Sequence, residues 1–114
     1  MAGDKKRWRA YKARVRQLPP NYRTAAGAIE RYLMYFVPGD GDSAASMFED
    51  LADLFEQAAA DGTPVREIVG EDPAEFAGTF ARNYAEGGYV PARARKRLTD
   101  AIARAEEAEE EVPR

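Results

Sequence analysis

The fold of this chain is decided by the stretch SAASMFEDLADLFEQAAADG, residues 43–62. Its large apolar side chains recur every three or four positions, which is the spacing of one face of an α-helix. These side chains are Met47, Leu51, Leu54, Phe55 and Ala58. Gly62 comes directly after the helical pattern and suits the left-handed backbone that often ends a helix. The stretch therefore predicts one long amphipathic helix over residues 43–61.

Two further helices are predicted on the N-terminal side of this stretch. Residues 4–18 place an apolar face beside a basic one, with Asp4 in position to cap the start. Pro19 ends this helix because a residue before proline is pushed out of helical geometry. Residues 21–37 continue as a second helix, and the glycine-rich turn GDGDS follows, with Asp42 or Ser43 capping the long helix. The two apolar faces consist of Trp8, Tyr11, Val15 and Leu18, and of Tyr22, Ala26, Ile29, Leu33 and Phe36.

Short helical signals dominate the C-terminal side. Thr63 and Pro64 open one turn of helix with Val65, Ile68 and Val69 facing inward. The run DPAE, residues 72–75, combines a capping Asp with a Pro at the first helical position. The helix that it opens carries Phe76, Phe80 and Tyr84 and ends at Gly87-Gly88. A last helix takes Pro91 near its start and turns Leu98 and Ile102 inward.

These patterns predict an all-α protein: a compact single domain of five to six helices over residues 1–104. The segment 106–111 offers no large apolar side chain, so the end of the last helix is expected to fray. Residues 105–114 are then an acidic, flexible tail. At 114 residues the chain has the length of one domain.

Several kinds of chemistry are excluded by composition. The chain contains no cysteine and no histidine, so thiolate nucleophiles, Ser-His pairs and imidazole or thiolate zinc sites cannot be built. No apolar run approaches the ~20 residues of a membrane-spanning helix, and the start MAGDKK lacks the apolar stretch of a secretory signal. We therefore expect a cytoplasmic protein that is not an enzyme, with no catalytic residues, no metal site, no cofactor and no membrane contact.

Charge is divided unevenly along the chain. Residues 1–23 contain eight bases and one acid, whereas residues 24–86 contain three bases and thirteen acids. On a helical projection, one line of basic residues lies beside the apolar face of the first helix. We call this line the basic strip; it consists of Lys5, Arg9, Lys12 and Arg16. Arg7 and Arg14 lie at the other edge of that face. Such charge asymmetry indicates either that oppositely charged faces of the same molecule pair with each other or that a partner binds one of the charged surfaces.

Two interpretations of the basic strip follow. It binds an acidic partner, either the acidic helix over residues 43–61 or another protein, or it follows the phosphates of a nucleic acid. No helix-turn-helix or zinc finger pattern accompanies the strip, and the remaining chain is acidic. Long Lys and Arg stems also cover apolar edges, which gives a structural reason to surround Trp8 with them. Protein contact is therefore favoured, with nucleic-acid binding as the alternative.

Other ligand sites have structural explanations as well. Glu49, Asp53 and Glu56 recur on one helix face and could bind a hard cation such as Mg²⁺, but a solvated face is the simpler interpretation. The tyrosines could line a small-molecule cleft, although most of them lie on packing stripes. A dimer patch over residues 32–37 is also possible, because Met34 and Tyr35 lie off the main stripe.

The order of these segments resembles a known family. The pieces GDKKRWRAYKARVRQLPPNYR, AIERYLMYF, GDGDSAASMFEDLADLFEQAAADG and VREIVGED are similar to the small bacterial family called domain of unknown function 1048. The resemblance covers roughly residues 3–86, and its specific parts are the DKK-W-x-x-Y-K-x-R start, the LP-x-x-YR turn and the DLFE-x-A-x-x-G ending. Two departures are the absence of an apolar segment ahead of DKK and a poor match after Tyr84.

The resemblance implies a compact all-α domain of five or six helices and brings no catalytic residues. Because members of this family are often encoded beside PadR-like transcriptional repressors, it also implies an accessory role in regulation through contact with such a repressor. We therefore expect a helical protein-interaction domain, an accessory factor in bacterial transcriptional regulation, whose basic strip forms the contact. Direct nucleic-acid binding and small-molecule or carboxylate-metal binding are the alternatives.

Overall fold

The computed structural model of this chain describes residues 2–36, 38, 40–84 and 92–111. Within these ranges all regular structure is helical, so the expected all-α class is confirmed. The elements are α1 (Ala2–Arg16), α2 (Pro20–Leu33), the 3₁₀ turn η1 (Met34–Phe36), α3 (Gly41–Asp61), α4 (Val65–Val69), α5 (Pro73–Ala81) and α6 (Ala92–Glu111). The six α-helices of the described part agree with the expected five to six.

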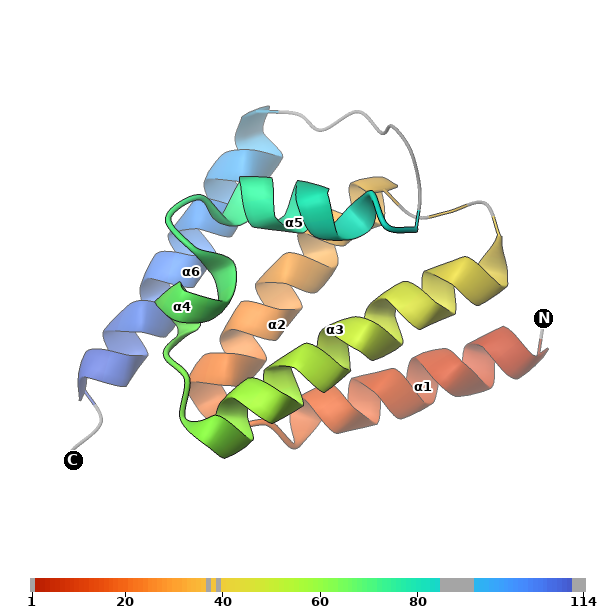
Figure 1. The fold of residues 1–114 in the computed structure, drawn as a ribbon, viewed down its shortest axis with the longest axis horizontal. Helices are drawn as coiled ribbons and strands as arrows, with labels where there is room; N and C mark the ends of the chain where they lie inside the picture. Colours follow the sequence, from red (N-terminus) through yellow and green to blue (C-terminus); the bar gives the residue numbers. More distant parts are fainter. Residues whose placement is uncertain (1, 37, 39, 85–91, 112–114) are drawn as a thin grey trace.

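The helices form two main pairs. α1 lies alongside α3, and α2 packs against α6 over most of its length. Figure 1 shows α2 running behind α3, while α5 crosses the upper end of the molecule and α4 links α3 to α5. Because α2 contacts all the other helices, its small and aliphatic side chains lie at the centre of the domain.

The core consists of the faces that periodicity predicts, with one exchange on α3. Met47, Leu51 and Phe55 are fully buried, as expected from residues 43–62. Leu54 is only half-buried, and Phe48 takes a buried place instead because its ring packs against Trp8 and Tyr11 of α1. The inward face of α3 is therefore turned slightly further toward α1 than the sequence pattern indicates.

Helix boundaries follow capping chemistry. Gly62 adopts a left-handed conformation (φ 72°) and ends α3, and Asp72 caps α5 by accepting hydrogen bonds from the backbone N–H groups of Ala74 and Glu75, both as predicted. The cap of α3 is Asp40 rather than Asp42 or Ser43, because its carboxylate accepts from the N–H groups of those two residues. α1 begins at Ala2, so Asp4 lies inside the helix instead of capping it. The predicted end at Gly87-Gly88 lies outside the described residues.

The end of α6 differs from the expected tail. Ala105 is fully buried, and the Glu109 carboxylate accepts hydrogen bonds from the Val65 backbone N–H (2.9 Å) and from Asn21 Nδ2 (3.1 Å). Arg66 donates to Glu106 at 2.8 Å. Residues 105–109 therefore belong to the packed domain, and the predicted boundary after residue 104 lies inside a helix.

No helix of the described segments combines the length and the apolar character that crossing a membrane requires.

Candidate partner-binding surface

The structure divides the basic strip into three exposed cations and one that is engaged inside the molecule. Lys5, Arg9 and Arg16 are exposed on α1, and among the described residues none of them forms an ion pair. The guanidinium of Arg9 reaches only the Lys5 carbonyl, at 3.5 Å. These three side chains therefore present uncompensated positive charge to whatever approaches α1.

Lys12 behaves differently from its neighbours in the strip. Its ammonium lies 2.9 Å from a carboxylate oxygen of Glu30 on α2 and 5.4 Å from the centre of the Trp8 ring. The Glu30 side chain is 8% exposed and that of Lys12 is 38% exposed. Lys12 therefore compensates a buried charge and covers Trp8, so it is not available to a partner as the other three cations are.

Tyr11 lies beneath this pair. Its hydroxyl is buried and forms no hydrogen bond with the described residues. Burial and, secondarily, the negative charge of Glu30 raise the pKa of the Tyr11 hydroxyl well above its ordinary value of 10.0. Tyr11 is therefore a neutral core side chain.

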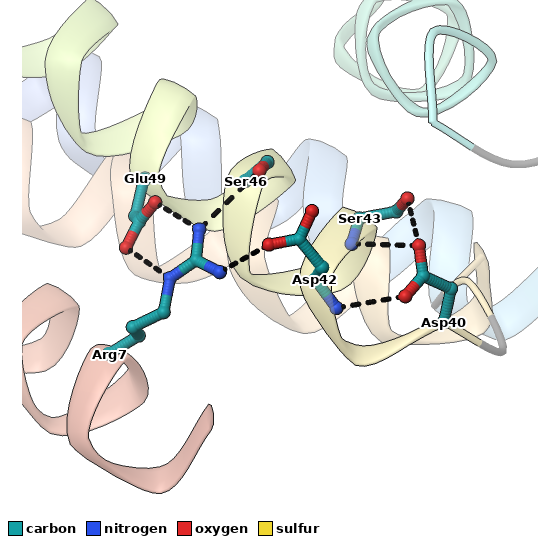
Figure 2. A network of polar contacts seen from close by, with 6 residues as sticks. All are labelled: Arg7, Asp40, Asp42, Ser43, Ser46 and Glu49. Carbon is teal, nitrogen blue, oxygen red and sulfur yellow. Dashed lines mark hydrogen bonds and ion pairs between the residues drawn. The ribbon is translucent and has the colours of Figure 1, made fainter. Parts of the chain in front are cut away.

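The other edge of α1 pairs with α3. Arg7 donates to both carboxylate oxygens of Glu49, at 3.0 and 2.7 Å, and to Asp42 at 2.7 Å. Figure 2 shows this guanidinium between the two acids, next to the Asp40 cap that begins α3. Two turns along α1, Arg14 contacts Glu56 and Asp53, at 2.6 and 2.5 Å. Pairing between the basic first helix and the acidic third helix is therefore confirmed, but it runs through Arg7 and Arg14 and not through the basic strip.

These ion pairs make part of the stability depend on pH. The hydrogen bonds from Arg14 hold the pKa of Glu56 below its ordinary value of 4.5. Because that pKa is lower in the folded state than in the unfolded state, the pair stabilises the fold above about pH 4.5 and loses this effect as pH falls through the lowered value.

We expect Arg14→Gln to lower the free energy of unfolding by about 0.2–1 kcal/mol at pH 7, the range of partly exposed pairs. The deficit should be smaller at pH 3 than at pH 7, because pH 3 lies below the ordinary Glu pKa of 4.5, where the contribution of the pair falls with pH. Urea unfolding at both pH values measures the difference. Arg16→Gln, at an exposed cation on the same helix, should show no such change with pH, and an Arg14→Gln deficit as large at pH 3 as at pH 7 would contradict the assignment.

An apolar groove opens beside the strip, where α1, η1 and the start of α3 meet. Its volume is about 340 Å³, and its lining includes Trp8, Tyr11, Met34, Ala44, Ala45 and Phe48. Met34 is 44% exposed, and in the described part of the chain no other large aliphatic or aromatic side chain is as exposed. Arg7 also borders the groove, but its guanidinium is occupied by Asp42 and Glu49. We call this feature the Trp8 groove.

The groove escaped sequence analysis for a specific reason. The sequence pattern places Trp8 on the packing face, yet Trp8 is only partly buried, and the same pattern places Met34 off the main stripe. The two side chains lie far apart in sequence, so periodicity within one helix cannot bring them together. The apolar character of residues 32–37 on more than one side was the available signal.

The residues of the alternative metal site have other partners. Glu49, Asp53 and Glu56 are all paired with Arg7 or Arg14. Asp50, which lies beside them in the sequence, accepts a hydrogen bond from the Tyr84 hydroxyl. Burial, with Asp50 as the second cause, raises the pKa of Tyr84 to about 12. In the described ranges no cluster of three or more acidic side chains is arranged to hold a metal ion.

The tyrosines do not converge on one cleft. Tyr11 and Tyr22 are buried on separate helices, and the Tyr22 hydroxyl donates to the Thr63 carbonyl at 2.7 Å. Tyr32 and Tyr35 lie near each other on α2 and η1, with ring centres 6.3 Å apart. Tyr32 and Tyr35 border one cavity together.

Comparison with known proteins gives one match. The family model described as a protein of unknown function (DUF1048) matches residues 1–103. The match extends past the point near residue 86 where the resemblance was expected to fade, and it includes the first half of α6. No curated protein and no solved structure matches the chain.

Proposed function

Because this chain belongs to the DUF1048 family of proteins of unknown function, we propose its role from the surface of the domain: a non-enzymatic, cytoplasmic domain that works by contacting an acidic partner protein. The observation that carries this proposal is the Trp8 groove next to unpaired cations. Protein interfaces combine an apolar centre with a polar rim and are enriched in Trp, Met and Arg. Trp8 and Met34 line the apolar groove, and Lys5 and Arg9 are exposed cations close to Trp8 in the sequence of α1 that can supply the polar rim.

The regulatory part of the proposal rests on the resemblance that the sequence carries. Its implied neighbourhood with PadR-like repressors makes such a repressor the first partner to test, with the chain as an accessory factor in bacterial transcriptional regulation. Direct nucleic-acid binding is the weaker alternative. Arg7, Lys12 and Arg14 are occupied by acids of the same chain, and an apolar groove offers nothing to a phosphate backbone.

The triple variant Lys5→Glu, Arg9→Glu, Arg16→Glu should weaken capture of a purified PadR-like repressor by at least about tenfold, because like charges across an interface repel. Lys12 is left in place, since its removal would leave the buried Glu30 carboxylate without its cation. Met34→Asp should weaken capture as well, by placing a charge in the groove, without cost to folding at an exposed position. Pull-down and surface plasmon resonance measure both effects.

The matched control changes three exposed arginines on the opposite helix pair, Arg31→Glu, Arg97→Glu and Arg104→Glu, and alters net charge by the same amount. This variant should bind the repressor normally. Undiminished capture by the α1 triple variant would contradict the proposal. So would a duplex DNA gel shift at about 50 mM salt that only this variant loses, or a homodimer, seen by light scattering, that Met34→Asp dissociates.

A further inference from the structure

A second cavity lies between α2 and α6, away from the surface described above. Its volume is about 270 Å³. It exists because the two helices meet through small side chains: Ala28 of α2 faces Ala94 and Ala101 of α6, and all three are buried. Longer side chains from both helices border the hollow around these alanines. We call it the α2–α6 cleft.

The rim of this cleft is strongly basic. Arg31 comes from α2, and Arg97 and Arg104 come from α6, two helical turns apart. Within the described residues none of these three guanidinium groups forms an ion pair. This differs from Arg7, Arg14 and Arg66, each of which contacts two acids.

Among the described residues one acid borders the cleft, and it does not neutralise this charge. Asp100 lies between Arg97 and Arg104 in sequence, but its carboxylate accepts from Lys96 Nζ at 2.9 Å. Three guanidinium groups therefore border one small cavity, and the acid described beside them, Asp100, also pairs with Lys96. Arg presents a planar set of donors that matches carboxylate and phosphate oxygens, so an anion is the ligand that this rim would bind.

The side chains that form the walls of the cleft indicate a second property of the ligand. Tyr32 and Tyr35 border the cleft with their rings tilted at 59° to each other, and Leu98 lies on the facing helix. Aromatic and aliphatic walls suit a flat or apolar body. The volume is just below the ~300–1,000 Å³ of ordinary ligand pockets, so the ligand is small.

We propose that the α2–α6 cleft binds a small organic anion, with its carboxylate or phosphate on Arg31, Arg97 and Arg104 and its apolar body against Tyr32 and Tyr35. This site is independent of the proposed partner surface, which uses α1, η1 and the start of α3. Neither proposal requires the other.

Isothermal titration of the full chain with four probes tests the site. Phenyl phosphate and benzoate carry an anion and a ring, inorganic phosphate carries only the charge, and phenol carries only the ring. At least one of the two aromatic anions should bind about tenfold more tightly than both inorganic phosphate and phenol, and the preferred one identifies the headgroup. Amide NMR shifts should move at Ala28, Tyr32 and Ala101 and stay unchanged at Trp8 and Phe48.

Substitutions at the rim distinguish specific binding in the cleft from nonspecific attraction of anions to a positively charged surface. Arg97→Gln and Arg104→Gln should each weaken binding about tenfold, the value of one hydrogen bond to a charged group. Arg97→Lys should recover only part of the affinity, because it keeps the charge but loses the planar donors. Arg9→Gln, at an exposed arginine of α1, is the control and should bind as the unchanged protein does.

Two results would overturn the proposal: no heat and no shift at Tyr32 with either aromatic anion at millimolar concentration, or binding that the double variant Arg97→Gln, Arg104→Gln retains in full. Circular dichroism checks that the variants are folded, which is expected because both positions are exposed. Loss of repressor capture in the α1 triple variant does not bear on this result, so the two proposals fail separately.

Discussion

Replacing Phe55 with alanine lowers the free energy of unfolding by about 3–5 kcal/mol. Phe55 lies in the middle of α3, is 0% exposed, and is among the largest fully buried side chains of the domain. Its removal leaves a cavity surrounded by helices that cannot collapse freely, because α3 is fastened to α1 by the arginine pairs at both ends of their contact. Urea unfolding followed by circular dichroism measures the loss.

Phe80→Ala is the matched control for this experiment. The same atoms are removed, but Phe80 on α5 is only partly buried and packs on the outside of the core. Its loss should therefore be clearly smaller. Equal losses for the two variants would show that the buried face of α3 is assigned wrongly.

Lys12→Met lowers the free energy of unfolding by about 1–3 kcal/mol, the cost of leaving a buried acceptor without its partner. The variant keeps the length and apolar stem that cover Trp8, so the effect comes from the Glu30 carboxylate, which then lies buried without a cation. Arg9→Met removes an exposed cation from the same helix and should change stability by less than about 0.5 kcal/mol.

A second substitution tests the cause of this loss. Glu30→Leu in the Lys12→Met background removes the buried charge, so the double variant should return to within about 1 kcal/mol of the original protein. If the double variant stays as unstable as Lys12→Met alone, lost packing and not the unpaired carboxylate is responsible.

Periodicity predicted the helices and most of the core because both depend on positions within one segment. The face of Met47, Leu51 and Phe55 and the caps at Gly62 and Asp72 are local features, and the structure has them as expected. The difference between the predicted and the observed core of α3 has a physical cause in the packing of α1. Phe48 displaced Leu54 from the core because the aromatic rings of α1 lie on that side of α3, and no pattern within α3 contains that information.

The candidate surfaces depended on contacts between helices, and there the sequence was less informative. A helical projection places Lys12 in line with Lys5, Arg9 and Arg16. Such a projection shows where each side chain lies around the helix axis, but it does not show which residue of another helix the side chain contacts. Glu30 could not be identified as that neighbour before α1 and α2 were placed together. The grouping of Arg31 with Arg97 and Arg104 has the same origin, because it requires α2 and α6 to lie side by side.

Glu109 gives the domain a particular order of assembly during translation. Its carboxylate joins Asn21 at the beginning of α2 to Val65 at the beginning of α4, so both sites remain open until the ribosome has made the final helix. Until α6 is present, the face of α2 that packs against it is exposed, and transiently exposed apolar surface of this kind makes an incomplete chain prone to aggregation. α6 thus completes the packing of α2, α4 and α5.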